Sequence, residues 1–377
     1  MIKINERIEL AKNWLLNSGI QNLDGEYKGA FNSWFDIDKK NYPYAYSKIT
    51  GYGITALLYL YNFSKEKILL ERAKLAADWL MNKATHKSGG ILCRHFYKES
   101  EFMGSFENEE LFLFDSGIVL NGMTLLHETT KEKKYLEFSK KLADFIISKQ
   151  KEDGSFYAVY DAKNKKLVDD EEKWSNQSGA FHNKLAIGLL KLYNLTKDEE
   201  YKKSAVKICN YSMKFFKDNG RVITFSKTEN TSFNLHCYTS EGLYVAGKYL
   251  KNKKYLEYSK RATQYLFSIQ KPNGGIPQFF KNNNLVEFER SDILAQSLRL
   301  GALNSINKEK LERLARKLLK FQNLDIKQRG GFRYGYDDQG NRYEHLNSWC
   351  TMFALQALIL YKQFSEKNVK FNEFYLV

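Results

Sequence analysis

The sequence predicts an all-α fold of the (α/α)6 toroid class, in which six helical hairpins close into a ring. Short β-like segments are expected in the loops on one face of that ring. Three observations lead to this prediction: one sequence pattern recurs six times, two kinds of helix alternate, and the first and last helices are of opposite kinds. Only three prolines interrupt the 377 residues, which leaves long stretches free to be helical.

The repeated pattern is clearest in residues 131–156 and has two fixed points. An aromatic residue lies near the end of each Lys- and Glu-rich amphipathic helix, and a glycine turn follows about ten residues later. The aromatic residues are Trp14, Trp79, Phe145, Tyr211, Tyr265 and Phe321, and the glycines are Gly25, Gly90, Gly154, Gly220, Gly275 and Gly331. Four turns follow a glutamine, at Gln21, Gln150, Gln270 and Gln322.

Between the amphipathic helices lie segments that are apolar nearly all round, as is typical of helices buried on both sides. They span residues 44–61, 111–128, 178–193, 234–250, 289–303 and 344–361. The chain starts with an amphipathic helix at about 5–18 and ends with an apolar one, so these two can pair and close the ring. A straight solenoid would instead need polar capping repeats. We therefore expect one toroidal domain over residues 1–377.

Composition excludes several classes of protein. Charges run through the whole N-terminal segment, so we expect no signal peptide, no membrane span and, by default, a cytoplasmic location. The four cysteines lack the spacing of a metal knuckle or a disulfide framework. His236, Cys237 and Cys350 form a candidate zinc set, but the motifs of zinc-binding toroids are absent. We therefore expect no metal and no cofactor.

The formal net charge of +15 has two interpretations. Most lysines alternate with acids at predicted helix starts, which is typical of a solvated exterior. The excess also attracts polyanions, and because no nucleic-acid-binding module is recognisable, it favours an acidic glycan over a nucleic acid. The expected partner is a polysaccharide or oligosaccharide, with the oligomeric state left open.

The direction of the loops predicts where such a ligand binds. The longer loops all run from an amphipathic helix into the next apolar one, so they gather over the N-terminal ends of the apolar helices. These ends carry free N–H groups and positive dipole character. A cleft there suits an anionic or polyhydroxylated ligand.

Titratable residues in the first turns of the apolar helices are the candidate catalytic groups. They are Asp115, His182, His236, Asp292 and His345, and Lys48 shares their register. Carboxylates and imidazoles can transfer protons once burial or charged neighbours shift their pKa. Structural roles stay open, because aspartate also suits a helix N-cap and histidine can be a satisfied core residue. Glu241, one turn beyond His236, can orient that histidine or pair with another buried donor.

Aromatic and arginine residues around the same cleft are the candidate substrate-binding groups. Aromatic rings can stack on the C–H faces of sugars, and arginine can bind a carboxylate or sulfate through two parallel hydrogen bonds. For most single aromatic residues, packing is the competing interpretation. The candidates are Trp34, Tyr46, Tyr52, Arg94, Trp174, Arg290, Arg333, Tyr334, Asn347 and Trp349.

Over nearly its full length the chain resembles six-hairpin toroid proteins of capsule and exopolysaccharide loci. Residues 46–53, residues 114–122 and the Gln-x-x-Asp/Asn-Gly pattern carry this resemblance. More remotely, Asp115 at the start of an apolar helix is similar to the catalytic aspartates of unsaturated glucuronyl hydrolases. The toroidal domain of glucuronyl C5-epimerases shares the architecture. We do not find a residue that matches the other catalytic aspartate of the hydrolases, nor the catalytic tyrosine and glutamate set of the epimerases. The resemblance therefore assigns a catalytic role only to Asp115.

The leading functional hypothesis is a carbohydrate-active enzyme that uses general acid/base chemistry on an acidic, uronate-containing glycan. Hydrolysis is favoured, with Asp115 paired with Asp292 or a histidine. A uronate epimerase or lyase would instead remove the proton beside the carboxylate with a histidine or tyrosine, and an arginine would stabilise the resulting charge. A non-catalytic glycan-binding or assembly protein is a hypothesis of a different class. Terpene cyclases and prenyltransferases also form such toroids. Their acidic and zinc-binding motifs are missing from this chain, which disfavours that class.

Overall fold

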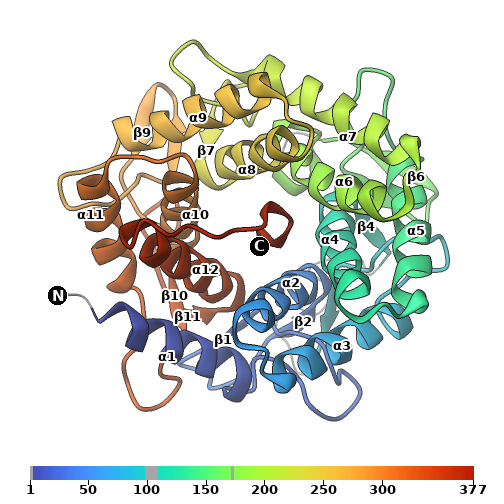
Figure 1. The fold of residues 1–377 in the computed structure, drawn as a ribbon, viewed down its shortest axis with the longest axis horizontal. Coiled ribbons are helices and arrows are strands. Elements are labelled where there is room, and N and C mark those ends of the chain that lie inside the picture. The colour runs from blue at the N-terminus through green and yellow to red at the C-terminus, as the bar shows by residue number, and fades with distance from the viewer. Residues whose placement is uncertain (1–2, 98–108, 171–173) are drawn as a thin grey trace.

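The computed structural model describes residues 3–97, 109–170 and 174–377, and in that part twelve α-helices form a ring. Figure 1 shows an inner layer of helices around the centre and an outer layer around them. The inner helices are α2 (Ser47–Ser64), α4 (Leu113–Thr130), α6 (Leu185–Thr196), α8 (Phe233–Tyr249), α10 (Ser291–Leu303) and α12 (Ser348–Ser365). The outer helices are α1 (Ile4–Asn17), α3 (Lys67–Asn82), α5 (Lys133–Ile147), α7 (Glu199–Ser212), α9 (Lys253–Ser268) and α11 (Lys308–Leu319). A 3-10 turn, η2 (Ala180–Lys184), leads into α6.

The two kinds of helix differ in burial as their sequences predict. In α4 every residue from Leu113 to Leu126 is buried, because outer helices cover one side and the ring centre lies on the other. In α5 the buried residues form one stripe that includes Tyr135, Leu142 and Ile146. Burial of apolar side chains on this scale is the main stabilising contribution to such a fold.

Glycine allows most of the hairpins to approach the next outer helix closely. A Cβ on Gly154 would lie 2.7 Å from the carbonyl oxygen of Lys207 in α7, so no other residue fits without movement. Gly330 makes the same approach to α1, where a Cβ would lie 2.0 Å from the carbonyl oxygen of Leu10. The last hairpin therefore meets the first as the third hairpin meets the fourth, and the predicted closure is confirmed.

The glycine that carries this contact differs from the prediction in four turns. In the first turn it is Gly29, whose Cβ would lie 2.1 Å from the carbonyl oxygen of Leu75, and not Gly25. The other three turns differ by one residue. Positive φ angles occur at Gly89, Gly274 and Gly330, each one residue before the predicted position. The reason is that the close approach to the neighbouring helix selects the residue in the left-handed conformation, and two adjacent glycines are indistinguishable by sequence alone.

The glutamines of the pattern join neighbouring hairpins. The Nε2 atom of Gln150 donates to the carbonyl oxygens of Gly154 (3.0 Å) and of Ser204 in α7 (3.1 Å). Across the closure, Gln322 donates in the same way to Gly330 (3.1 Å) and to Arg7 in α1 (2.9 Å). Gln21 and Gln270 make the equivalent pairs of bonds.

Short antiparallel strands join the loops that enter the inner helices. The four sheets are β2 (Tyr44–Tyr46) with β3 (Arg94–Phe96); β4 (Glu110–Phe112), β5 (Val159–Asp161) and β6 (Lys166–Val168); β7 (Thr231–Ser232), β8 (Phe279–Lys281) and β9 (Asn284–Val286); and β1 (Trp34–Phe35), β11 (Arg342–Asn347) and β10 (Phe332–Tyr336). In the last of these, Trp34 of the first long loop pairs with Asn347 of the final one. The first and the final loop are thus joined by strand pairing where the ring closes.

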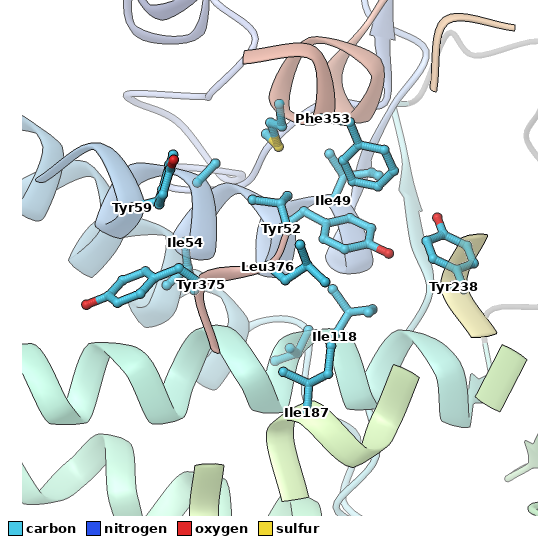
Figure 2. Close-up of a cluster of buried hydrophobic side chains, with 14 of the residues drawn as sticks. Ile49, Tyr52, Ile54, Tyr59, Ile118, Ile187, Tyr238, Phe353, Tyr375 and Leu376 are labelled. Atoms are coloured by element: carbon cyan, nitrogen blue, oxygen red, sulfur yellow. The ribbon is translucent and has the colours of Figure 1, made fainter. Parts of the chain in front are cut away.

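The C-terminal segment fills the centre of the ring beneath those loops, an arrangement the sequence analysis did not foresee. In Figure 2, Tyr375 and Leu376 lie among side chains of several inner helices, including Ile54 and Ile118. Gln356 of α12 donates to the carbonyl oxygen of Tyr375 (2.7 Å) and accepts from the amide of Val377 (3.1 Å). The segment therefore gives the loop-side cleft a packed floor.

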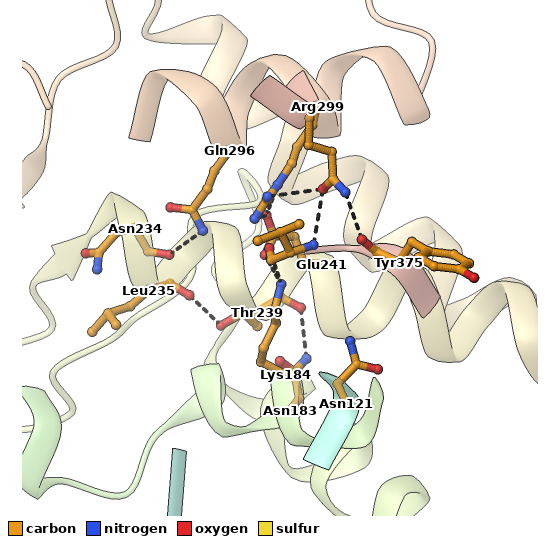
Figure 3. A network of polar contacts seen from close by, with 12 residues as sticks. Asn121, Asn183, Lys184, Asn234, Leu235, Thr239, Glu241, Gln296, Arg299 and Tyr375 are labelled. Carbon is orange, nitrogen blue, oxygen red and sulfur yellow. Dashed lines mark hydrogen bonds and ion pairs between the residues drawn. The ribbon is translucent and has the colours of Figure 1, made fainter. Parts of the chain in front are cut away.

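A buried ion network lies beside this segment (Figure 3). Glu241 of α8 binds Lys184 (2.7 Å) and the Nε atom of Arg299 (2.7 Å), and all three side chains are at most 2% exposed. Of the two roles predicted for Glu241, the structure gives it that of a partner for buried donors. Removal of one member would leave an unpaired buried charge, which is strongly destabilising.

Candidate active-site cleft

A cleft of about 230 Å³ opens on the loop side of the ring. Three cationic side chains, Lys48, Arg94 and Arg290, line it together with one carboxylate, that of Asp292. Its aromatic lining comprises Tyr44, Tyr46, Tyr52, Trp174, Phe225, Tyr238, Phe279, Tyr334 and Trp349. The cleft is thus rich in aromatic surface and carries more positive than negative groups.

One helix position supplies much of this lining. Lys48, Asn234, Asp292 and Trp349 are the second residues of α2, α8, α10 and α12, respectively, and all four line the cleft. The inner helices point their N-terminal ends at the loops, so their second residues converge on the ring axis. The second residue of an inner helix thus lines the cleft in four of the repeats, with a different type of side chain in each.

The first wall of the cleft holds a phenol between two cations. Tyr46 lies opposite Arg94 in the β2–β3 pair, and the centre of its ring is 5.0 Å from the guanidinium carbon of Arg94. The Lys48 ammonium lies 4.9 Å from the same ring and 5.1 Å from the ring of Trp174. Burial raises the pKa of Tyr46 well above its usual value, and the charge of Asp115 raises it further, so the phenol keeps its proton at neutral pH.

The second wall is built around an arginine–aspartate pair. Arg290 donates to Asp292 from Nε (3.1 Å) and Nη2 (2.6 Å), and its guanidinium lies 4.7 Å from the ring centre of Tyr334. The indole N–H of Trp349 also donates to Asp292, at 3.4 Å. Asp292 is the second residue of α10 and not its N-cap, which is Arg290. Both oxygens of Asp292 thus have protein partners, and the carboxylate lines the cleft although only 1% of the residue is exposed.

Asp115 lies beneath the first wall and does not line the cleft. Only 3% of it is exposed, and its Oδ1 atom is 3.4 Å from the ammonium of Lys48. Its Oδ2 atom accepts a hydrogen bond from the thiol of Cys93, at 3.2 Å. Both carboxylate oxygens thus have protein partners, and the charge of Asp115 balances that of the buried Lys48.

His236 binds the backbone and is absent from the cleft lining. Its Nδ1 atom accepts from the amide of Val222 (3.2 Å), and its Nε2 atom donates to the carbonyl oxygen of Ala262 (2.9 Å). Burial lowers its pKa to about 4 despite the hydrogen bond to Ala262, so the ring is neutral at pH 7. With both nitrogen atoms engaged in the core, His236 has no atom available for proton transfer to a ligand.

His182 and His345 also lie outside the lining. His182 is 1% exposed, accepts from the amide of Gly179 (3.3 Å) and stacks on Phe181 with ring centres 4.5 Å apart. His345 belongs to β11 at the rim, where its ring stacks on that of Trp34 at 4.7 Å. Burial lowers the pKa of both histidines to about 4. The five candidate catalytic residues therefore do not share one rim as expected, and only Asp292 faces the cleft.

Two candidate binding residues have structural partners elsewhere. Asn347 is fully buried and caps α12, where its side-chain oxygen accepts from the amide of Cys350 (3.2 Å). Arg333 donates to Glu344 (2.7 Å) and Asn323 (2.8 Å) and lines a separate cavity.

Nine residues that the sequence analysis named line the cleft: Tyr46, Lys48, Tyr52, Arg94, Trp174, Arg290, Asp292, Tyr334 and Trp349. The lining residues that the sequence analysis did not propose are Tyr44, Ile49, Phe225, Ser232, Asn234, Tyr238 and Phe279. Asn234 could have been found from its helix position, since it shares that of Asp292 and Trp349. Phe279 is placed by strand pairing with Ser232, a contact that leaves no local signal.

The described part of the chain shows neither a metal-ligand cluster nor a membrane-spanning helix. In residues 3–97, 109–170 and 174–377, no three His, Cys, Asp or Glu side chains are grouped as a metal site requires. None of the helices in these ranges combines the length and apolarity that a membrane crossing needs.

Comparisons with known proteins support the architecture. Residues 126–252 match the family described as glycosyl hydrolase family 76. Cellobiose 2-epimerase from Bacillus thermoamylovorans B4167 is similar in structure, with a TM-score of 0.74 at 14% identity over 94% of this chain and 99% of that one. A sugar epimerase from a ruminal bacterium has a TM-score of 0.77 at 11% identity over 97% and 100% of the two chains.

The unsaturated glucuronyl hydrolase of Bacillus sp. GL1 is also similar, with a TM-score of 0.68 at 15% identity over 93% of this chain and 96% of that one. No curated protein sequence matches the chain significantly. These likenesses show that the chain has the (α/α)6 toroid fold, so the predicted fold class is confirmed. They also confirm the predicted resemblance to toroid proteins that include glucuronyl hydrolases and epimerases.

Proposed function

We propose that the chain is a carbohydrate-active enzyme that binds an acidic sugar of a polysaccharide or oligosaccharide in the cleft. The observation that carries this proposal is the lining, in which nine aromatic rings and three cations accompany one carboxylate. Aromatic faces pack against the C–H surfaces of sugar rings, and guanidinium groups bind carboxylates in a planar geometry. The match to a glycosyl hydrolase family and the likeness to sugar epimerases support the same class.

The reaction best suited to these groups is proton transfer at the carbon next to a uronate carboxylate. Removal of that proton places negative charge on the carboxylate, so cations that bind it stabilise the transition state. Arg94 and Arg290 reach the cleft from its two walls and supply those cations. This chemistry makes the chain a uronate epimerase or lyase, because it requires one group to take a proton and another to give one.

Asp292 and Tyr46 are the proposed proton-transfer pair. Asp292 takes the proton beside the carboxylate, and protonated Tyr46 returns one to the same carbon from the other wall, which inverts its configuration. In elimination, Tyr46 instead protonates the glycosidic oxygen as it leaves. In both cases Asp292 then loses its proton to water and Tyr46 regains one from it, so the protons balance.

The test is an assay of acidic and neutral oligosaccharides in D₂O, followed by NMR and mass spectrometry. Epimerisation places deuterium beside the carboxylate without shortening the chain, whereas elimination produces an ultraviolet-absorbing unsaturated uronate. Turnover of neutral sugars alone would refute the acidic substrate. Binding of acidic sugars without any turnover would favour a non-catalytic glycan-binding protein instead.

Three variants assign the roles. Tyr46→Phe and Asp292→Asn are each expected to reduce turnover by roughly 10²-fold or more, the usual contribution of general acid–base groups. The matched control is Tyr258→Phe on the outer helix α9, which removes a phenol that is not part of the lining and should leave turnover unchanged. Full turnover by Tyr46→Phe would remove Tyr46 from the mechanism.

Hydrolysis is the second candidate, favoured by the carboxylate of Asp292 in the cleft and by the structural likeness to a glucuronyl hydrolase. It predicts new reducing ends without deuterium in the carbon skeleton, and it needs a second acid or base. Asp115→Asn tests that part: full turnover by this variant excludes Asp115 as the partner. A cytoplasmic location and a role in polysaccharide biosynthesis stay predictions, which cell fractionation and deletion of the gene would test.

A further inference from the structure

A second cavity, of about 240 Å³, lies behind the wall that carries Tyr334. Four basic side chains line it, those of Lys317, Lys320, Arg333 and Arg342, with one acidic side chain, Glu289. We call it the basic groove. Its volume is close to that of the cleft, which we propose holds one acidic sugar.

The carboxylates of the basic groove are outnumbered by cations. Glu289 is bound by Lys271 (2.6 Å) and Lys317 (2.7 Å), and its side chain is 7% exposed. Glu344 is bound in the same way by Arg333 (2.7 Å) and Arg342 (2.5 Å). Each of these two carboxylates is therefore shared by two cations.

Lys320 adds a further positive charge. It is exposed at the end of α11 and forms no ion pair within the part of the chain that the structure describes. Two further acids lie at the edge, Glu287 at 3.8 Å from Lys271 and Asp325 at 3.7 Å from Arg333. Their side chains are 59% and 83% exposed, so water and salt screen them strongly. The groove thus keeps a positive potential toward an entering ligand.

The basic groove and the cleft share their dividing wall. Arg290 lines the cleft and its neighbour Glu289 lines the groove. In β10, Tyr334 lines the cleft while Arg333 lines the groove. The ring of Tyr334 contacts that of Tyr343, a groove residue that is 42% exposed, edge to face with centres 5.9 Å apart. An aromatic surface therefore continues from one cavity to the other.

We propose that the basic groove is a second binding site for an acidic sugar of the same glycan chain. It rests on the proposed function, since it assumes an acidic glycan in the cleft. The chain passes from the cleft across Tyr334 and Tyr343, and a further carboxylate or sulfate of that glycan binds among Lys317, Lys320 and Arg342. The substrate is then a long acidic oligosaccharide or polymer, and a disaccharide occupies the cleft alone.

The test compares binding of uronate disaccharides and octasaccharides by calorimetry, with galacturonate, glucuronate-containing and alginate fragments as probes. The wild-type chain should bind octasaccharides more tightly than disaccharides. The Lys320→Glu/Arg342→Glu variant should weaken octasaccharide binding by about tenfold and leave disaccharide binding unchanged. Both residues are exposed, so the variant should fold, which circular dichroism checks.

The matched control is Lys203→Glu/Lys254→Glu, which makes the same change of charge at exposed sites on α7 and α9. It should bind both lengths as the wild type does. Equal wild-type affinity for both lengths, or equal loss for both in the groove variant, would overturn the second site and leave the proposed function standing. If no acidic fragment binds the wild-type chain at either length, the acidic substrate and the second site are both refuted.

Discussion

In four inner helices, the side chain of the fourth residue accepts a hydrogen bond from a backbone amide of the loop that precedes the helix. Thr50 accepts from the amide of Phe31 and Thr351 from that of Phe332, both at 2.9 Å. Ser116 accepts from Ile91 at 3.4 Å, and His236 occupies the same helix position in α8. A buried amide without a partner is costly, so this position is structural whatever residue type fills it.

This equivalence predicts how substitutions at His236 act. His236→Ala leaves the amide of Val222 and the carbonyl of Ala262 without partners, so the free energy of unfolding should fall by about 2–5 kcal/mol. His236→Thr should lose less, because threonine restores the first bond, as Thr50 and Thr351 do. Urea denaturation measures both values. Equal losses for the two variants would contradict the equivalence.

Helix geometry explains why the first turns of the inner helices, which the sequence identified, supply only part of the lining of the candidate cleft. Consecutive helix residues are about 100° apart, so the second and fourth residues point in nearly opposite directions. Asp292, a second residue, faces the cleft, whereas His236, a fourth residue, faces the loop backbone. Sequence patterns place helix starts only within a few residues, and that margin is enough to exchange the two roles.

At the scale of the element, the repeated glutamines should stabilise the ring equally at every junction that has one. Gln150→Ala and Gln322→Ala each remove two hydrogen bonds to carbonyl groups, one on the neighbouring outer helix. Each should lower the free energy of unfolding by about 1–3 kcal/mol. Urea denaturation compares them, with the exposed Gln339→Ala as the matched control, which should have no effect.

A clear difference between Gln150→Ala and Gln322→Ala would mean that the junction between the last and first hairpins is not equivalent to the others. Equal losses would support a ring without a weak point, since Gln322 bonds to Arg7 of α1 as Gln150 bonds to Ser204 of α7.

The helices were predictable because each shows a hydrophobic pattern over several turns, whereas the strands are too short to show any. β1 is two residues long, and its partner β11 lies more than 300 residues further along the chain. Such pairings depend on the closed ring and not on local sequence. They also set the positions of cleft residues such as Phe279, which explains why the loop part of the site was only partly foreseen.

For the whole molecule, the loop face forms the cleft and the centre of the ring forms the packed core. The loops and the first turns of the inner helices supply the cleft, while the C-terminal segment and the Glu241 network fill the space below it. Tyr52 and Tyr238 line the bottom of the cleft and also belong to the core cluster of Figure 2. The cleft floor is thus continuous with the packed centre, and any acid-induced loosening of the core should reach the site.

Because several buried histidines are neutral in the folded chain, we expect the fold to lose stability as the pH falls. Burial lowers the pKa of His95, His182, His236 and His345 to about 4, against an ordinary value near 6.5 in the unfolded chain. Between these two values the unfolded chain binds more protons than the folded one. The stability contributed by the neutral rings is therefore complete above pH 6.5 and is lost as the pH falls toward 4.

The free energy of unfolding should accordingly decline between pH 6.5 and 4.5, above the range in which most carboxylates titrate. The fully buried His182 and His236 should each contribute up to about 1.4 kcal/mol per pH unit in that window. Urea denaturation at a series of pH values measures the slope. His236→Thr serves as the control, because it removes one titrating ring. It should therefore reduce the slope of the unfolding free energy against pH by the contribution of one histidine. A slope that is unchanged in this variant would mean that the His236 ring is already protonated in the folded chain, contrary to its two backbone hydrogen bonds.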